Sequence, residues 1–148
     1  MAQRLKADSN FTPCRVDDGD ELFPNGIFEF NVTRILEHIA GHPTEIDLVE
    51  IDVKDFCQEH SVLEQSHVES VDTSRPLVLA EIAPGHYNLI DGHRMIEKAR
   101  RLGINKLRAY KLKAHQHIGF LTTRKAYLTY VEYWNGKVDA GFAGPRKG

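Results

Sequence analysis

The residues of this chain best suited to chemistry stand together in the run Asp91-Gly92-His93-Arg94. The run follows an apolar stretch and precedes a helical pattern, so it is predicted to form a strand-to-helix turn. The first amides of a helix lack intrahelical partners and carry partial positive charge, which stabilises an anion placed beside them. We expect Asp91 to cap this helix and Gly92 to leave room for a ligand.

The two side chains after Gly92 favour a phosphate as that ligand. His93 and Arg94 both donate to phosphate oxygens, and a guanidinium can do so through two parallel bonds. Asp-Gly is also a common turn dipeptide, but Arg94 opposes the dipole at a helix N-terminus, which makes a purely structural role less natural. We therefore predict that Gly92, His93 and Arg94 bind phosphate, and that Asp91, His93 and Arg94 carry any catalysis.

A metal ion is the expected companion of a bound nucleotide. A triphosphate usually brings a hard cation to carboxylate oxygens, so Asp91 is the predicted Mg²⁺ ligand, with Glu81 and Glu97 as weaker candidates. His115 and His117 would lie on one face of an extended segment. No third ligand is indicated near them, and with eight histidines in the chain chance adjacency is the simpler explanation.

Charge divides the chain into two halves. Residues 1–75 hold sixteen acidic and six basic side chains, whereas residues 76–148 hold five acidic and thirteen basic ones. The basic half could attract nucleic acid, with Lys98, Arg101, Lys106 and Arg108 as the contacts. Alternatively the two halves neutralise each other, which suits a formal net charge of −2 better.

The elements around the turn follow from apolar spacing. Residues 76–82 form a buried strand, and residues 83–86 are a tight turn to a partner strand over residues 87–90. A helical pattern then runs from Met95 to Leu102, ends at Gly103, and leads into a strand over residues 106–113.

The flanking regions add two helices. Asn31 is predicted to cap a helix that Gly41 and Pro43 end, after a turn at residues 23–26 and before a strand at residues 46–51. Residues 55–60 are expected to form a helical turn, and residues 61–74 a loop or short helix. Thr122 or Thr123 caps the last helix, which Gly136 should end. One face of this helix carries Tyr127, Tyr130, Val131 and Trp134. These side chains either pack in the core or stack against nucleic-acid bases.

These elements predict an α+β fold, a small mixed sheet with flanking helices. Residues 23–139 form a single domain, between a flexible N-terminal arm (residues 1–22) and a flexible tail (residues 140–148). No apolar run approaches the ~20 residues that cross a bilayer, and no apolar leader opens the chain. Cys14 and Cys57 match no metal or redox spacing, so we expect a reduced, cytoplasmic protein with no membrane partner.

The central third of the chain resembles the ParB/sulfiredoxin superfamily. The resemblance covers residues 75–113 and rests on Arg75-Pro76-Leu77-Val78-Leu79, on Tyr87-Asn88-Leu89-Ile90-Asp91-Gly92-His93-Arg94, and on Leu102-Gly103-Ile104. It implies a ParB/sulfiredoxin-like fold. It also implies that ATP or CTP phosphates, with Mg²⁺, lie against Gly92, His93 and Arg94. A general base of the kinase type would be Glu50 or Asp52.

The superfamily's activities differ, and so do its motifs. Sulfiredoxin has a Cys in the turn where this chain has Gly92, which argues against sulfinic acid reduction. Partition proteins have Glu where His93 stands and Arg where Met95 stands. The function predicted first is therefore nucleotide binding, with phosphotransfer or hydrolysis as the reaction of any enzyme. The alternatives are a DNA-binding nuclease or partition-type protein, and a non-catalytic interaction module.

Overall fold

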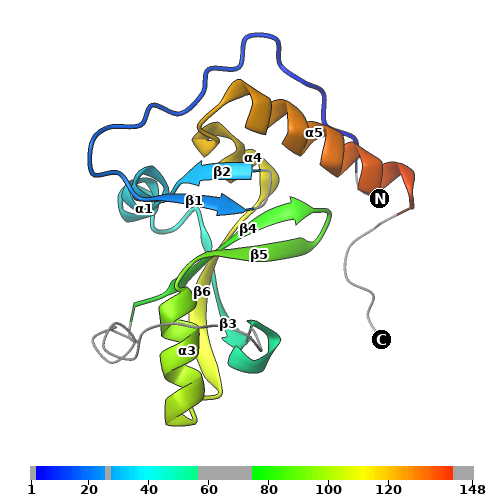
Figure 1. The fold of residues 1–148 in the computed structure, drawn as a ribbon. Coiled ribbons are helices and arrows are strands. Elements are labelled where there is room, and N and C mark those ends of the chain that lie inside the picture. The colour runs from blue at the N-terminus through cyan, green and yellow to red at the C-terminus, as the bar shows by residue number, and fades with distance from the viewer. Residues whose placement is uncertain (1–2, 26–27, 57–74, 142–148) are drawn as a thin grey trace.

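The structure, a computed structural model, describes residues 3–25, 28–56 and 75–141. These residues form a four-stranded mixed sheet, a separate two-stranded hairpin and flanking helices, so the predicted α+β class with a small mixed sheet is confirmed (Figure 1). The elements are β1 (Leu22–Asn25), β2 (Phe28–Asn31), α1 (Val32–Gly41), β3 (Asp47–Asp52), the 3₁₀ turn η1 (Val53–Phe56), β4 (Leu77–Ala83), β5 (His86–Asp91), α3 (His93–Leu102), β6 (Lys106–Leu112), α4 (Ala114–His117), the 3₁₀ turn η2 (Ile118–Phe120) and α5 (Arg124–Asp139).

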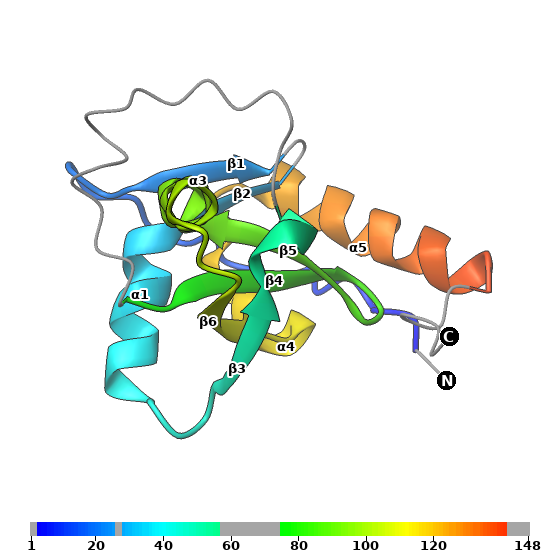
Figure 2. The ribbon, with the colours of Figure 1, turned by 90° about the horizontal axis from the view of Figure 1, so that it is seen from below.

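The sheet has the strand order β3-β6-β4-β5. Only the central pair, β4 and β6, is parallel; the two outer pairs are antiparallel. A parallel pair needs a crossover, and the segment between β4 and β6 provides it as β5 and α3. Figure 2 shows α3 on the side of the sheet away from α4.

Strand β4 is apolar at nearly every position because both faces of the sheet are covered. Val78 and Ala80 belong to a core cluster that includes the buried side of α5. Leu77 and Leu79 point the other way, into a second cluster with the buried side of α3. The continuous apolar run of the sequence is therefore the signature of a strand buried on both faces, as predicted.

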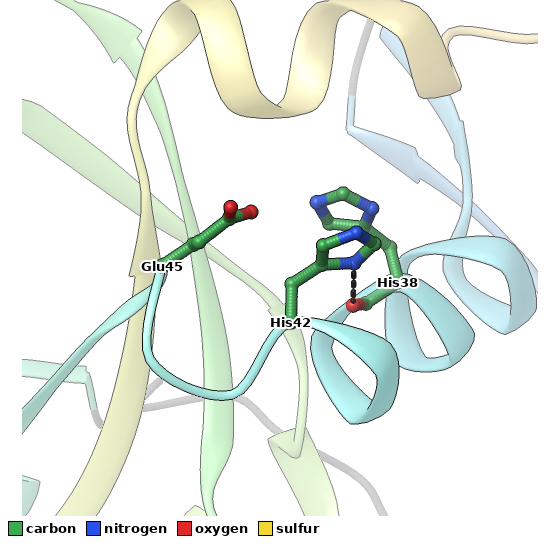
Figure 3. Close-up of side chains that lie close together, drawn as sticks. All are labelled: His38, His42 and Glu45. Carbon is green, nitrogen blue, oxygen red and sulfur yellow. Dashed lines mark hydrogen bonds between the residues drawn. The ribbon is translucent and has the colours of Figure 1, made fainter.

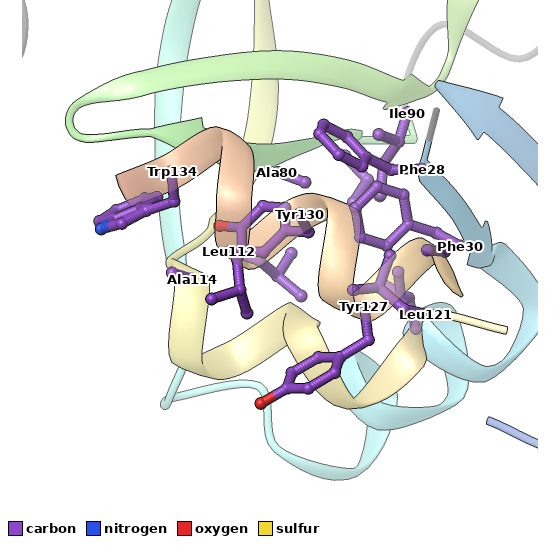
Figure 4. Packing of buried hydrophobic residues seen from close by; sticks show 14 of the residues in the cluster. Phe28, Phe30, Ala80, Ile90, Leu112, Ala114, Leu121, Tyr127, Tyr130 and Trp134 are labelled. Atoms are coloured by element: carbon purple, nitrogen blue, oxygen red, sulfur yellow. The ribbon is translucent and has the colours of Figure 1, made fainter. Parts of the chain in front are cut away.

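The larger cluster explains the aromatic stripe of the last helix (Figure 4). Tyr127, Tyr130, Val131 and Trp134 are all at most 7% exposed, so the core interpretation is confirmed and base stacking by this stripe is excluded. The Tyr130 hydroxyl donates to the Glu81 carbonyl at 2.7 Å, which satisfies the polar end of the most buried ring.

Three predicted helix ends are confirmed. The Asn31 side chain accepts a hydrogen bond from the Arg34 amide at 3.1 Å, and Thr123 accepts from the Ala126 amide at 2.9 Å. Gly103 ends α3 with a φ of 73°. Local capping chemistry was readable from the sequence because each cap bonds within three residues.

One predicted helix end and one predicted turn are wrong. Gly136 does not end α5, which continues to Asp139; a glycine inside a helix costs only about 1 kcal/mol, and Val138 beyond it packs against the core. Of the turn predicted at residues 23–26, residues 23–25 belong instead to strand β1, which pairs antiparallel with β2; Gly26 lies outside the described residues. Pro24 is compatible with this strand because a two-stranded hairpin consists of edge strands.

The segment before β1 lies along α5 without regular secondary structure (Figure 1). Phe11 stacks on Tyr127 with ring centroids 3.9 Å apart. The Leu5 backbone exchanges two hydrogen bonds with the Asn135 side chain, at 2.6 and 2.8 Å. The mobility predicted for residues 1–22 stays a prediction, and these contacts show the path the segment follows.

Some predictions fall outside the described residues. The helical turn predicted at residues 55–60 overlaps η1 only at its start, and the segment 57–74, with Cys57, lies outside, as do residues 142–148 of the tail. No helix in the described parts of the chain combines the length and apolar character that crossing a lipid bilayer requires.

Candidate functional site

A cavity of about 380 Å³ opens where β5 ends and α3 begins. Three segments that are distant in sequence form its wall: the residues at β1, the segment at Arg75 just before β4, and the β5–α3 junction. The Phe23 ring stacks on His93 with centroids 5.0 Å apart and so joins β1 to the start of α3. The lining residues are Glu21, Phe23, Arg75, Ile90, Asp91, Gly92, His93, Arg94 and Met95.

The predicted strand-to-helix turn is present, but two of its residues act differently from expectation. Asp91 is the last residue of β5 and does not cap α3; the N-cap is Gly92, with no side-chain hydrogen bond to the first turn. Gly92 has a φ of 110°, where L side chains are strained. A Cβ there would lie 2.3 Å from Leu77 Cδ2 and 2.8 Å from Met95 Cε. Gly92 is therefore required by the backbone and the core, not by space for a ligand.

Asp91 is the unusual group of the site. It is 7% exposed, and its buried Oδ2 has no hydrogen-bond partner among the residues that the structure describes. The nearest cation is the Arg75 guanidinium, 3.6 Å from Oδ2. Burial raises the pKa of the Asp91 carboxyl and Glu21 adds to the rise, whereas the Arg75 charge and a hydrogen bond from the Gly92 backbone oppose it. A buried carboxylate without full compensation is costly to keep, and such groups are concentrated at functional sites.

The cations of the site differ in their environment. Arg94 is exposed and forms no ion pair with any residue that the structure describes, so its guanidinium is free to meet an anion. Burial lowers the pKa of the His93 imidazole. At neutral pH His93 is therefore uncharged and offers one N–H donor, not a positive charge. Arg75 and Arg94 supply the positive charge of the cavity.

The other predicted carboxylates are not brought to this cavity. Glu97 is buried on α3 but is held by Arg100 Nη2 at 2.5 Å and by Arg101 Nε at 3.4 Å. These partners, the Arg100 hydrogen bond above all, lower the pKa of Glu97. Glu81 accepts from the Gly85 and Ala114 amides and ties the β4–β5 hairpin to α4. Neither of these carboxylates lines the cavity. Of the three predicted Mg²⁺ ligands, Asp91 is the one in the cavity wall.

The proposed general bases and nucleic-acid contacts also lie elsewhere. Glu50 and Asp52 are on β3 at the far edge of the sheet and do not line the cavity. Asp52 Oδ1 accepts from Lys106 Nζ at 2.7 Å, and Glu50 faces Arg108 across the ladder. Arg101 is paired with Glu97. Of the four predicted nucleic-acid residues, the remaining one, Lys98, is on α3 outside the cavity wall.

The histidine pair at residues 115 and 117 is not on one face of an extended segment. Residues 114–117 form helix α4, which leaves His115 exposed and buries His117 completely. His117 Nε2 donates to the Glu81 carbonyl at 2.5 Å, and burial lowers the pKa of this imidazole to about 4. His117 is thus a neutral core residue.

Five lining residues were missed by sequence reasoning as members of the site; two of them, Ile90 and Met95, lie beside the predicted turn in the chain. The others are Glu21, Phe23 and Arg75. They reach the cavity only because β1 and the residues just before β4 fold against the β5–α3 junction. Arg75 is the first residue of the segment that resembles the superfamily, and this position was the only indication in the sequence that it belongs to the site. Glu21 and Phe23 carried none, because they are about seventy residues away from the turn in the chain.

The assembled site joins two guanidiniums, a neutral imidazole, the first amides of α3 and two carboxylates around one cavity. Guanidiniums and helix amides suit phosphate oxygens, and the carboxylates suit a hard cation. The chain matches no protein-family profile, no curated protein and no solved structure.

Proposed function

We propose that the cavity at the start of α3 binds the phosphates of a nucleotide together with Mg²⁺. The observation that carries the proposal is the buried Asp91 carboxylate, in the wall that also holds Arg75 and Arg94; its Oδ2 has no hydrogen-bond partner in the described part of the chain. An anion alone would meet the charges of Asp91 and Glu21. A divalent cation next to these carboxylates removes that conflict, because it attracts both the carboxylates and the phosphate.

The residues present fit such a cation. Mg²⁺ is usually held by one or two protein carboxylates, with substrate phosphates and waters as the other ligands. Asp91 and Glu21 are the two carboxylates in the cavity wall. When bound, the ion would neutralise phosphate charge. Arg94 would contact the phosphates from the open side and Arg75 would orient Asp91.

The family resemblance supports the same proposal. The order strand, hairpin, glycine turn, helix and strand that the motifs imply is the order of β4, β5, α3 and β6. We propose a ParB/sulfiredoxin-like fold on this basis. Any phosphoryl transfer or hydrolysis would use Asp91, His93 and Arg94, since these residues surround the cavity.

Isothermal titration with ATP, CTP and GTP, each with Mg²⁺, tests the proposal. Arg94→Ala should weaken binding at least about tenfold, since a hydrogen bond to a charged group contributes roughly 1.5–3 kcal/mol. Lys125→Ala is the matched control: Lys125 is an exposed cation at the same position in the first turn of α5, outside the cavity. It should leave the affinity unchanged.

The proposal fails if none of the three nucleotides binds, or if one binds equally well to wild type and Arg94→Ala. DNA binding that weakens steeply with salt and survives Arg94→Ala would instead support the nucleic-acid alternative.

A further inference from the structure

The end of α1 and the turn after it bring two imidazoles and a carboxylate together (Figure 3). His38, His42 and Glu45 each offer one ligand atom, and these atoms lie within 4.8 Å of one another. Within residues 3–25, 28–56 and 75–141, no other histidines, cysteines or carboxylates form such a group of three. None of the three lines the cavity beside Asp91, so this cluster is separate from the proposed phosphate site.

The local chain holds the three side chains in place. His38 and His42 are four residues apart and so share one face of α1 and its cap; their ring centroids are 4.3 Å apart. The Glu45 amide donates to the His42 carbonyl at 3.1 Å, which turns the chain back toward the imidazoles. Gln116 Nε2 donates to the Glu45 carbonyl at 2.9 Å and so fixes this turn against α4.

One hydrogen bond prepares His42 as a ligand. Its Nδ1 lies 2.9 Å from the His38 carbonyl oxygen. A carbonyl oxygen only accepts, so Nδ1 carries the hydrogen and Nε2 of the neutral ring has a free lone pair. Metal-binding histidines typically donate their second ring N–H to a carbonyl or carboxylate in this way. The bond therefore selects the tautomer that a metal needs.

The stacking of the two rings keeps the imidazoles side by side at the C-terminal end of α1. A purely structural explanation, a cation at the helix C-terminus, requires only one histidine. The His38 ring also contacts Phe120, with centroids 5.6 Å apart, but neither explanation accounts for the carboxylate that Figure 3 shows directed toward the pair.

We propose that His38, His42 and Glu45 bind a divalent transition metal of the zinc class. Two imidazoles and one carboxylate suit Zn²⁺, Co²⁺ or Ni²⁺ and not Mg²⁺ or Ca²⁺, which prefer oxygen ligands. A metal about 2.1 Å from each ligand places the ligand atoms roughly 3.4 Å apart. The side chains reach this spacing by small rotations, because His42 and Glu45 are exposed and His38 is half-buried. The fourth position is left to water or an added ligand.

Titration of the metal-free chain with Co²⁺, followed by visible absorption and repeated with Zn²⁺ by calorimetry, tests the site. We expect saturation at a single equivalent and no thiolate charge-transfer band. His38→Ala, His42→Ala and Glu45→Gln should each weaken binding at least about tenfold, the scale on which lost metal contacts act. His86→Ala, a change at an exposed histidine in the β4–β5 hairpin, should leave the affinity unchanged.

The proposal is overturned by any of three results: no saturable binding of either metal, equal affinity in wild type and the three site variants, or a thiolate band that Cys14→Ser or Cys57→Ser removes. His42 and Glu45 are exposed and His38 is half-buried, and circular dichroism of each variant establishes whether the fold is kept. Nucleotide titrations of the same variants should match wild type, so this site and the Asp91 cavity can fail independently.

Discussion

The buried carboxylate of Asp91 lowers the stability of the ligand-free protein, and a bound ligand would explain why it is there. Its carboxylate is buried; within the ranges 3–25, 28–56 and 75–141 its Oδ2 lacks a hydrogen bond, and its one cationic neighbour, Arg75, is 3.6 Å away. In a chain selected for stability alone, an uncharged side chain would fit this place better. The unmet charge is explained if a cation and a phosphate complete the site.

Asp91→Asn should therefore stabilise the ligand-free protein while abolishing Mg²⁺-dependent nucleotide binding. Removal of a buried charge without full compensation should add about 1 kcal/mol to the free energy of unfolding at neutral pH, a rise of a few degrees in Tm. Chemical denaturation and calorimetry measure both effects. Glu97→Gln is the matched comparison: Glu97 is equally buried but ion-paired, so its substitution should destabilise.

The difference in unfolding free energy between Asp91→Asn and wild type should depend on pH. Because folding raises the pKa of Asp91, protonation favours the folded state, and the wild type loses stability as pH rises through that raised pKa. The difference between wild type and Asp91→Asn should thus be largest at neutral pH and disappear below about pH 3.9, the ordinary Asp pKa. A difference that grows toward acid pH would contradict the assignment.

Gly92 is a second residue whose role is testable alone. Gly92→Ala combines a positive φ with a Cβ 2.3 Å from Leu77 Cδ2, so we expect a loss of about 3 kcal/mol or more in the free energy of unfolding. Gly103→Ala has a similar backbone conformation but open space around the new Cβ. It should cost only about 1 kcal/mol. Equal losses in urea unfolding would show that crowding at Gly92 is unimportant.

At the scale of elements, the sequence predicted most of what local chemistry decides. Strands β4, β5 and β6 and helices α1, α3 and α5 follow from apolar spacing, and the N-caps of α1 and α5 follow from side chains that bond within three residues. Strand β1 was mistaken for a turn because Pro24 and the residues after it have turn propensity, whereas pairing with β2 decides the conformation. The cavity wall could not be predicted, since Glu21, Phe23 and Arg75 join it through tertiary packing.

The N-caps of α1 and α5 test how much a capping hydrogen bond contributes to the free energy of unfolding. Thr123→Ala removes one capping bond and should cost about 1 kcal/mol. Asn31→Ala should cost at least twice as much, because the Asn31 amide also donates to the Arg15 carbonyl at 3.1 Å and to Asp20 at 2.9 Å in a fully buried place. Urea denaturation of the two variants measures both costs; equal values would mean that the buried bonds of Asn31 add nothing.

At the scale of the whole molecule, the register of β3 against β6 explains the divided charge of the sequence. Asp47 faces Lys111, Glu50 faces Arg108 and Asp52 faces Lys106. The acidic first half and the basic second half thus meet across one pair of strands. This pairing supports mutual neutralisation of the two halves over a basic surface for nucleic acid.

The pairing predicts weak DNA binding by the wild type and stronger binding when the acids are removed. The combined variant Asp47→Asn, Glu50→Gln, Asp52→Asn should bind duplex DNA more tightly and with a steeper dependence on salt, because the carboxylates of β3 no longer offset the positive charge of β6. Fluorescence anisotropy at several salt concentrations measures both slopes. Tight, salt-sensitive binding by the wild type would contradict this account of the charge.

The central claim, a phosphate and Mg²⁺ held where β5 meets α3, is tested most directly by amide chemical shifts. Addition of ATP or CTP with Mg²⁺ to ¹⁵N-labelled protein should move the resonances of Gly92, His93 and Arg94 first, together with the Arg75 side chain, and Asp91→Asn should remove these changes. Unchanged resonances for this turn at saturating nucleotide, or changes confined to β6 and the outer face of α3, would contradict the claim.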